Sequence, residues 1–371
     1  MTVLAETSHP LPLEPVQLLD EHGDPADGQV LPPAAQRLQM YRRLVVGRRF
    51  DRQAAALTRQ GRLAVYPSSN GQEACQVGAV LAVRDTDWLF PTYRESVALV
   101  TRGIDPVEVL TLLRGDWHCG YDPYHHRTAP QCTPLATQAL HAVGLAHAAR
   151  LAGDDVVALA FVGDGATSEG DCHEALNFAA VYRAPVVFFV QNNQYAISVP
   201  LAKQTAASSL AHKAIGYGMP GRRVDGNDVL AVYRVVRDAV EHARAGQGPT
   251  LVEAVTYRMD AHTNADDASR YRTSAEVDAW RKRDPITRLE RHLRAVGVLD
   301  DAGVAEIAAE AEDFAARLRE RMNTDPVLDP MEMFRHVYAE PTPQLREQAA
   351  LLAAELAAEA EAPVGGVEAR A

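Results

Sequence analysis

Two apolar runs with a helix-like segment between them constrain the fold of this chain more than any other feature. The first run, 156–162 (VVALAFV), stops at Gly163-Asp164-Gly165, and the second, 185–191 (PVVFFVQ), ends in Asn192-Asn193. The stretch between them, 166–184, is expected to form one helix. This order predicts a β-α-β unit with parallel strands, and hence an α/β fold with a mostly parallel sheet and helices on both faces.

Polar residues at the ends of these two strands predict a metal and anion site. In open α/β sheets, ligands bind beyond the carboxyl ends of the strands, so Asp164 and Asn193 are expected to face one crevice. A carboxylate and a carboxamide suit Mg²⁺, which keeps several waters and completes its shell with phosphate oxygens. The flanking glycines let backbone approach a ligand, and the following helix offers free N–H groups to an anion. The pattern therefore indicates a Mg-diphosphate site.

Each motif alone has a purely structural explanation. Asp164 is also a candidate helix N-cap, and Asn192-Asn193 a candidate turn. A nucleotide-binding loop is disfavoured, because neither GxGxxG nor GxxxxGK[ST] occurs at 163–170. Together, one helix and one strand apart, GDG and NN are typical of thiamine diphosphate enzymes.

Further motifs extend that similarity over roughly the middle three quarters of the chain. They are NGQEACQVGA, FPTYRE, TPLATQ, GDGATSEGD, QNNQYAIS, DGNDVLAVY, DAHTNADDASRYR and DPITRL. With them the chain resembles the α subunit of the heteromeric 2-oxo acid dehydrogenase first component, a thiamine-dependent decarboxylase with a thiamine diphosphate-binding fold. The motifs PLATQ and DGNDV are most similar to the corresponding motifs of the branched-chain enzymes. A pyruvate dehydrogenase and an acetoin-cleaving subunit are the alternatives within the same enzyme class.

The resemblance implies residues for the metal and the cofactor. Asp164, Asn193 and the backbone carbonyl of Tyr195 would ligate Mg²⁺. Residues implied to contact thiamine diphosphate are Tyr93, Arg94, Thr133, Leu135, Gly163, Gly165, Ala166, Gln191, Arg258 and His262. The two arginines are fork donors suited to phosphate oxygens, with a surface salt bridge as the alternative for each. For Leu135 the alternative is an ordinary core position.

One position departs from the branched-chain pattern. Those relatives have an arginine directly before the asparagine pair, and here the residue is Gln191, which can donate a hydrogen bond but brings no charge. Potassium is a further family feature and a candidate ion here. The resemblance would hold it near Cys132, Pro134, Thr137 and Gln138.

His262 is the candidate for acid–base work. It follows a predicted strand end, in a polar loop, where an imidazole with a pKa near neutrality can move protons. A solvent-exposed bystander is the alternative. In mammalian relatives the next position is a regulatory phosphoserine, and here it is Thr263. Asp266, Asp267, Arg270 and Arg272 are expected to order the loop through ion pairs.

The chemistry that the resemblance implies needs a second α/β domain. In this superfamily a carboxylate on the cofactor's aminopyrimidine comes from a second α/β domain, and this chain has room for one such domain. The resemblance therefore implies a separate β subunit, two α and two β chains in the active tetramer, and a lipoyl acyltransferase as the next component. The implied reaction is oxidative decarboxylation of a 2-oxo acid with acyl transfer to the lipoyl group. A non-catalytic scaffold subunit is the competing class, but it would lack the Mg²⁺ ligands or His262.

Composition excludes other classes of function. The net charge of −12 argues against nucleic acid, which is bound through Lys and Arg. No apolar run approaches the ~20 residues of a membrane helix. Residues 1–15 show neither a basic region nor a long apolar stretch, so the expected location is the cytoplasm. The Cys/His-rich stretch 117–132 has poor zinc-ligand spacing, and we assign no role to His118, His125 or His126 in this expected loop over the site.

The expected organisation has three parts. Residues 1–32 are proline- and acid-rich and expected to be extended, 33–340 form the α/β domain with C-terminal helices, and 341–371 form an Ala/Glu-rich helical tail ending in disorder. Within the domain we expect helices over 34–60 and beyond residue 274, and a strand over 249–258. Asn227 or Asp228 is expected to cap the helix after DGND.

Overall fold

The computed structural model describes residues 14–116, 118–324 and 328–361. Of the expected extended segment, residues 1–13 lie outside the described part, as does the expected disordered end, 362–371. The chain divides into two compact units, Met1–Met322 and Asn323–Ala371. The sequence placed this boundary after residue 340 instead.

The centre of the first unit is a parallel five-stranded sheet. Its strand order is β1(Trp88–Phe90), β2(Ala158–Gly163), β3(Val186–Asn192), β7(Thr250–Val255) and β6(Gly221–Asp225). Every neighbouring pair in this sheet is parallel. The predicted β-α-β unit and the α/β fold class are therefore confirmed. Because β2 and β3 are neighbours with Gly163 opposite Gln191, the GDG and NN segments leave the sheet side by side.

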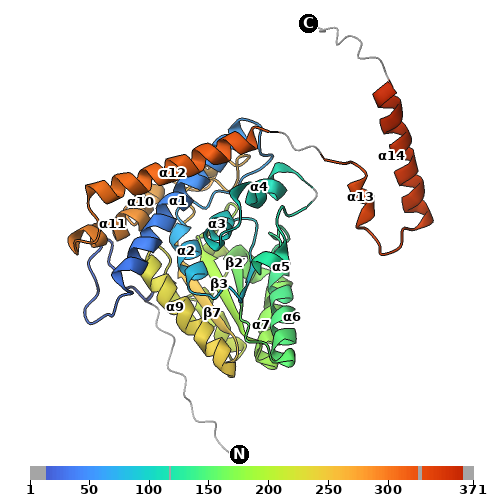
Figure 1. Ribbon diagram of the computed structural model, residues 1–371. Coiled ribbons are helices and arrows are strands. Elements are labelled where there is room, and N and C mark those ends of the chain that lie inside the picture. The colour runs from blue at the N-terminus through green and yellow to red at the C-terminus, as the bar shows by residue number, and fades with distance from the viewer. Residues whose placement is uncertain (1–13, 117, 325–327, 362–371) are drawn as a thin grey trace, which may run out of the picture. The chain divides into compact units, whose positions relative to one another are not determined.

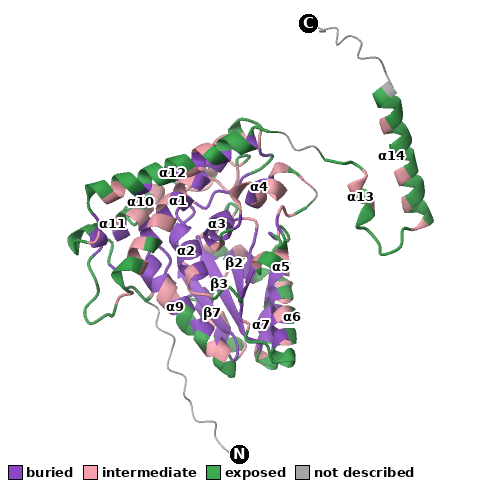
Figure 2. Ribbon diagram, in the orientation of Figure 1, coloured by how far each residue is buried: buried purple, intermediate pink, exposed green. Residues whose placement is uncertain are grey.

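Helices cover both faces of this sheet (Figure 1). On one side lie α1(Ala34–Arg59), α2(Glu73–Leu81) and α9(Val229–His242), and on the other α6(Thr137–Ala152) and α7(Gly170–Tyr182). The strands are buried on both faces, so their sequences are continuous apolar runs rather than alternating ones. Figure 2 shows the consequence, with the strands buried and the outward helix faces exposed.

Successive residues of β3 point to opposite sides. Val187 and Phe189 join the core under α1, α2 and α9, whereas Val186, Phe188 and Val190 join the core under α6 and α7. Full burial of each phenylalanine contributes about 1.5–3 kcal/mol. This two-sided burial fixes the strand register, because a shift by one residue would exchange the two faces.

The predicted helix 166–184 is wrong in one respect. A 3₁₀ turn, Gly165–Ser168, comes first, and α7 begins only at Gly170, because Glu169 between them is extended (φ −76°, ψ 146°). Asp164 makes no side-chain cap hydrogen bond, so the alternative reading of it as an N-cap is also wrong. The turn therefore presents backbone at the strand end while α7 starts farther away.

The remaining predicted elements are largely found. Helix α1 matches the predicted 34–60, and Asp228 caps α9 through the amides of Leu230 and Ala231. The expected helical region beyond 274 is broken where Asp284 caps α11, directly before Pro285. The other elements are α3(Ser96–Arg102), α4(Pro106–Arg114), α5(Pro123–His126), the hairpin β4(Tyr195–Ala196) and β5(Val199–Pro200), α8(Lys213–Gly216), α10(Ser274–Arg281), α11(Pro285–Ala295), α12(Asp301–Met322) and, in the second unit, α13(Glu332–Arg335) and α14(Pro343–Glu361).

Among the described helices, none has the length and apolar character needed to cross a membrane.

Candidate active site

A cavity of about 490 Å³ lies where the carboxyl ends of β1, β2, β3 and β7 meet. Every residue that the sequence nominated for Mg²⁺, thiamine diphosphate or catalysis lines it, although these residues are up to 169 positions apart. They are Tyr93, Arg94, Thr133, Leu135, Gly163, Asp164, Gly165, Ala166, Gln191, Asn193, Tyr195, Arg258 and His262. Parallel strands bring these segments together because all their carboxyl ends meet at one edge.

The expected metal ligands come from two adjacent strand ends and the hairpin after them. Asp164 is buried, and its Oδ2 accepts a hydrogen bond from Nε2 of Gln204 at 2.7 Å. Burial raises the pKa of this carboxyl group, while Gln204, Arg258 and the backbone of Asn193 act in the opposite direction. Asn193 lies next to it, with Oδ1 accepting from the amide of Tyr195 at 3.3 Å. A buried carboxylate with an amide oxygen beside it is a donor set suited to a hard cation.

Arg94 and His262 form a pair inside the cavity. Nη2 of Arg94 donates to Nδ1 of His262 at 3.0 Å and to the His262 carbonyl at 3.2 Å. Tyr93 packs edge-on against the imidazole, with ring centroids 6.0 Å apart. Because Nδ1 accepts this bond, the neutral imidazole carries its proton on Nε2.

The expectation that His262 titrates near neutrality is corrected by its surroundings. Burial first, and then the charges of Arg94 and Arg258, lower the pKa of His262 to about 4. The ring is therefore neutral over the physiological range and acts as a hydrogen-bond donor through Nε2.

Arg258 is buried three residues beyond the end of β7. Its guanidinium donates to the carbonyls of Tyr195 at 3.1 Å and Ile197 at 2.6 Å, and to the hydroxyl of Tyr271 at 2.9 Å. It is thus no surface salt bridge. In this structure it fixes the β4–β5 hairpin and orients the Tyr195 carbonyl, the expected metal ligand.

Gln191 does not present its amide nitrogen to a ligand. Nε2 donates to Oε1 of buried Glu95 at 2.6 Å, and Oε1 of Gln191 is buried with no hydrogen-bond partner. Burial raises the pKa of Glu95, although bonds from Thr92 and Gln191 oppose this. The position that is charged in the branched-chain pattern is therefore an uncharged amide here, in contact with the Glu95 carboxyl group.

Sequence reasoning assigned no role to Gln72, Glu95 or Gln204. Gln72 and Glu95 line the cavity, and Gln204 reaches Asp164 from a different segment. Gln72 and Glu95 stand in the motifs NGQEACQVGA and FPTYRE, which mark these segments without assigning a role to either residue. For Gln204 the sequence holds no signal, because its role depends on which segments the fold brings together.

The cavity fits a metal-bound diphosphate by three observations. Nε2 of Gln72 and Oε1 of Gln191 are buried and unpartnered, as expected for groups that await a ligand. A Cβ on Gly165 would lie 2.6 Å from Cβ of Ala196, so only glycine fits between turn and hairpin. Asp164 and Asn193 offer one carboxylate and one amide oxygen, so a cation held there would complete its shell with further oxygens such as those of phosphate.

Leu135 is not a core residue. It lines the cavity and is 45% exposed, which rules out the ordinary core alternative. It follows Pro134 at the start of α6, where Ala136 adopts a left-handed conformation (φ 65°). Such a conformation costs a non-glycine residue of order 1–3 kcal/mol and is typical of functional sites.

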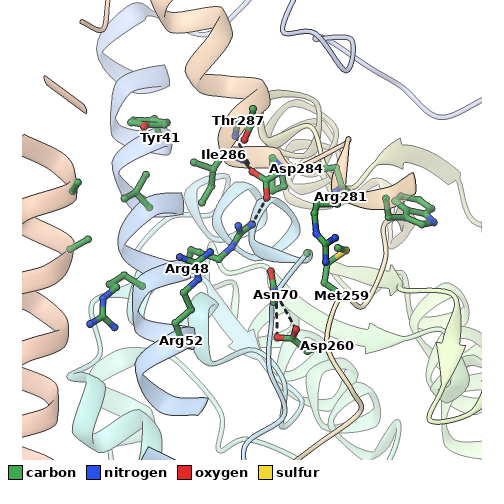
Figure 3. Close-up of a pocket in the computed structure, with 18 of the residues that line it drawn as sticks. Tyr41, Arg48, Arg52, Asn70, Met259, Asp260, Arg281, Asp284, Ile286 and Thr287 are labelled. Atoms are coloured by element: carbon green, nitrogen blue, oxygen red, sulfur yellow. Dashed lines mark hydrogen bonds and ion pairs between the residues drawn. The ribbon is translucent and has the colours of Figure 1, made fainter. Parts of the chain in front are cut away.

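A second cavity of about 600 Å³ is lined by residues of α1, α11 and α12 (Figure 3). Two of its arginines pair within the protein, Arg48 with Asp284 at 2.9 Å and Arg49 with Glu312 at 2.7 Å. Residues 70–71 and 259–260 line this cavity, while Gln72, Arg258 and His262 line the first. Neighbouring residues of the same two segments therefore line the two cavities.

The chain was compared with known proteins. The family model described as "Dehydrogenase E1 component" matches residues 41–330. The chain is 51% identical over 349 residues, 93% of its length and 95% of the relative, to a "3-methyl-2-oxobutanoate dehydrogenase subunit alpha" of Mycobacterium tuberculosis. It is 39% identical over 316 residues, 84% of its length and 85% of the relative, to a "Pyruvate dehydrogenase E1 component subunit alpha" of Staphylococcus aureus.

The fold, the site and these matches place the chain in the dehydrogenase E1 component family. The predicted family is thereby confirmed. The relatives are 2-oxo acid dehydrogenase α subunits, which are oxidoreductases, and the family implies dependence on thiamine diphosphate. The words "subunit alpha" in both names imply a partner β subunit.

Proposed function

We propose that this chain is the α subunit of a branched-chain 2-oxo acid dehydrogenase first component. With a β subunit it would decarboxylate the 2-oxo acid and pass the acyl group to the lipoyl group of an acyltransferase component. The observation that carries this is the cavity, where the GDG aspartate, the second asparagine of NN, two arginines and a neutral histidine share one space.

Asp164, Asn193 and the carbonyl of Tyr195 would hold Mg²⁺, which in turn binds the diphosphate. When bound, thiamine diphosphate supplies an electron sink for the carbon that loses CO₂. The 3₁₀ turn Gly165–Ser168 offers backbone to the diphosphate, including the amides of Gly165 and Ala166. Arg94 and Arg258 bring two positive charges to the cavity.

His262 would orient the substrate rather than store a proton. Arg94 holds its Nδ1, so Nε2–H can donate a hydrogen bond to a carboxylate or carbonyl oxygen of the 2-oxo acid. Its low pKa keeps this donor neutral, and the nearby guanidinium charges favour an anionic substrate. Tyr93 and Leu135 shape the apolar side of the same space.

The mouth of the cavity supports a covering β subunit. Leu135 and Ile197 line it and are 45% and 55% exposed, as expected for apolar groups that a partner covers. We propose two α and two β chains, with the β chain supplying the carboxylate for the aminopyrimidine. Isolated, this chain is expected to show no turnover.

Potassium is proposed for the segment at the start of α6. Oε1 of Gln138 is buried without a hydrogen-bond partner, while its Nε2 donates to the carbonyl of Phe161 at 2.7 Å. A carboxamide oxygen free in this way suits a hard cation. Cys132 and Pro134, also expected near potassium, lie in the adjoining segment. Thr263, in the loop with His262, is proposed as a phosphorylation site.

The substrate is tested by comparing 2-oxo acids with the co-expressed α/β complex. Pyruvate, 3-methyl-2-oxobutanoate, 4-methyl-2-oxopentanoate and acetoin would be compared by kcat/KM with thiamine diphosphate and Mg²⁺ present. A preference of more than about tenfold, ~1.4 kcal/mol, for the branched acids is expected, because the relative named for 3-methyl-2-oxobutanoate is 51% identical. A preference for pyruvate, which is in the name of the 39% identical relative, would change the assigned substrate to pyruvate and leave the proposed cofactor site unchanged. Cleavage of acetoin alone would refute the substrate class.

A further inference from the structure

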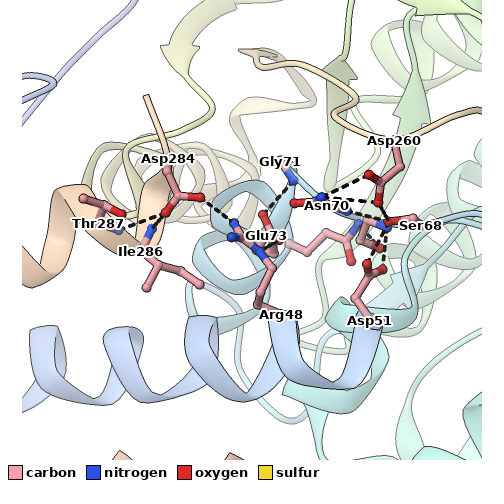
Figure 4. A network of polar contacts seen from close by, with 12 residues as sticks. Arg48, Asp51, Ser68, Asn70, Gly71, Glu73, Asp260, Asp284, Ile286 and Thr287 are labelled. Carbon is pink, nitrogen blue, oxygen red and sulfur yellow. Dashed lines mark hydrogen bonds and ion pairs between the residues drawn. The ribbon is translucent and has the colours of Figure 1, made fainter. Parts of the chain in front are cut away.

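A buried serine, Ser68, lies between the carboxyl groups of Asp51 and Asp260, two residues before the segment 70–72 that contributes to both cavities (Figure 4). Oγ of Ser68 is 2.7 Å from Oδ2 of Asp51 and 2.8 Å from Oδ2 of Asp260, and it accepts a hydrogen bond from the amide of Asn70 at 3.1 Å. Ser68 and Asp51 are 7% and 2% exposed, so solvent offers little competition.

These contacts need one proton more than two ionised carboxylates and a hydroxyl provide. A serine hydroxyl has one proton and can donate to only one of the two carboxylates. The other contact would then bring two lone pairs together at hydrogen-bond distance in a buried place, which is repulsive. Every contact becomes a hydrogen bond if one carboxyl group is protonated and donates to Oγ of Ser68.

Asp51 is the carboxyl group placed to carry that proton. Its Oδ1 already accepts from the hydroxyl of Tyr66 at 2.8 Å and the amide of Ser69 at 2.7 Å, so Oδ2 is the oxygen left to be protonated. Asp260, by contrast, accepts two contacts from Nδ2 of Asn70 at 3.2 Å, which suits an ionised acceptor.

The surroundings of Asp51 favour its neutral form. Burial raises the pKa of Asp51 to about 6, and the charge of Glu73 on α2 acts in the same direction, whereas the bonds from Ser69, Ser68 and Tyr66 oppose it. The other charged groups nearby are Asp260, across Ser68, and Arg94, whose charge acts on Tyr66. Glu73 is itself paired with Arg48.

Ser68 and Ser69 hold Arg94 at both ends. Nη1 of Arg94 donates to the carbonyl of Ser68 at 2.9 Å, and Oγ of Ser69 donates to the carbonyl of Arg94 at 2.7 Å. The other terminal nitrogen of Arg94 donates to His262. A shift of the 68–69 segment would therefore move the guanidinium and the imidazole together.

Asp260, on the other side of Ser68, belongs to the segment that carries His262. The amide of Met259 donates to the carbonyl of Asn70 at 3.1 Å, next to the Asn70–Asp260 contact. The amide of Tyr66 donates to the side chain of Asn264, two residues after His262, at 3.2 Å. The loop is thus attached to the 66–70 segment on both sides of His262.

We propose that Asp51 donates a proton to Ser68, that Ser68 donates to Asp260, and that this link positions Arg94 and His262 in the cofactor cavity. The roles of Arg94 and His262 rest on the proposed function, but the link itself does not. Asp51 and Ser68 are positioning residues, since neither lines the cavity. The link is complete when Asp51 is protonated and is lost as the pH rises through the folded-state pKa of Asp51, about 6.

The variant Asp51→Asn separates this proposal from one in which Asp51 acts as an ionised acceptor. In Asp51→Asn, Nδ2 donates to Ser68 as the protonated acid does, while Oδ1 still accepts from Tyr66 and Ser69. Ser68→Ala removes the link altogether. Thr101→Val is the matched control, because it removes another buried hydroxyl, one that donates to the Val97 carbonyl within α3.

The measurement is backbone hydrogen exchange of 259–272 in the cofactor-free α/β complex at several pH values, with each rate expressed relative to Asp51→Asn at the same pH. We expect Ser68→Ala to speed exchange about tenfold, and wild type to lose protection relative to Asp51→Asn above pH ~6, with Thr101→Val matching wild type. The dissociation constant of thiamine diphosphate should rise with Ser68→Ala by about tenfold and stay near wild type with Asp51→Asn.

Two results would overturn the proposal. If Asp51→Asn loosens 259–272 as much as Ser68→Ala, Asp51 acts as an ionised acceptor. If the ratio of the exchange rates of wild type and Asp51→Asn does not change with pH, Asp51 does not share a proton with Ser68. If wild type binds no thiamine diphosphate, the proposed function fails, whereas exchange in the cofactor-free complex still decides the link.

Discussion

Replacing Gly165 by alanine tests whether the GDG turn and the β4–β5 hairpin together form the metal site. The new Cβ would lie 2.6 Å from Cβ of Ala196. Carbon atoms pack at about 3.5–4.0 Å, so the two backbones must separate by roughly 1 Å, because neither methyl group can rotate away. Overpacking of this kind costs about 1–3 kcal/mol of folding free energy.

The larger effect is expected on cofactor binding. The turn carries Asp164 and the hairpin carries the Tyr195 carbonyl, so a separation of about 1 Å far exceeds the ±0.2 Å that metal–ligand distances tolerate. We expect the affinity for Mg²⁺ and thiamine diphosphate to fall about 10–100-fold. Isothermal titration of the α/β complex measures this, with thermal unfolding as the measure of stability.

Two further variants make the test specific. Gly170→Ala adds a Cβ with no heavy atom within 4 Å and should bind as wild type does. Ala196→Gly removes the opposing methyl group, so the double variant Gly165→Ala/Ala196→Gly should recover most of the lost affinity. Wild-type affinity in Gly165→Ala, or no recovery in the double variant, would refute the geometry of the site.

Three other changes have expected outcomes. Asp164→Asn should lower Mg²⁺-dependent cofactor affinity at least about 100-fold while leaving cofactor-free stability equal or higher, since burial raises the pKa of this carboxyl group; titration calorimetry and unfolding midpoints measure the two effects. Folded His262 has a pKa of about 4 against 6.5 unfolded, so the unfolded chain takes up the proton first and stability falls as the pH drops from 6.5 to 4; His262→Gln should lessen this slope in denaturant midpoints taken at pH 7 and 5. Gln191→Arg places a cation beside Glu95 and should lower the dissociation constant of thiamine diphosphate about tenfold. An unchanged or higher dissociation constant would show that the Gln191–Glu95 contact serves the site better.

The sequence by itself determined the sheet and the place of the site. Continuous apolar runs can be buried only between two helix layers, and parallel strands must end at one edge, so Asp164, Asn193 and the residues after β7 had to converge. The motif spacing added the cofactor, because GDG and NN lie one helix and one strand apart. These are local properties, encoded in periodicity and in residues next to strand ends.

Only the tertiary structure decided what each polar group does there. The low pKa of His262 comes from burial and from Arg94, 168 residues earlier, as well as Arg258 close by in the chain, and Gln191 is held by Glu95, 96 residues earlier. The link from Asp51 through Ser68 to Asp260 joins α1 to a loop more than 200 residues later in the chain. Proton positions and electrostatic shifts depend on three-dimensional distance and on exclusion of water, which residue spacing does not encode.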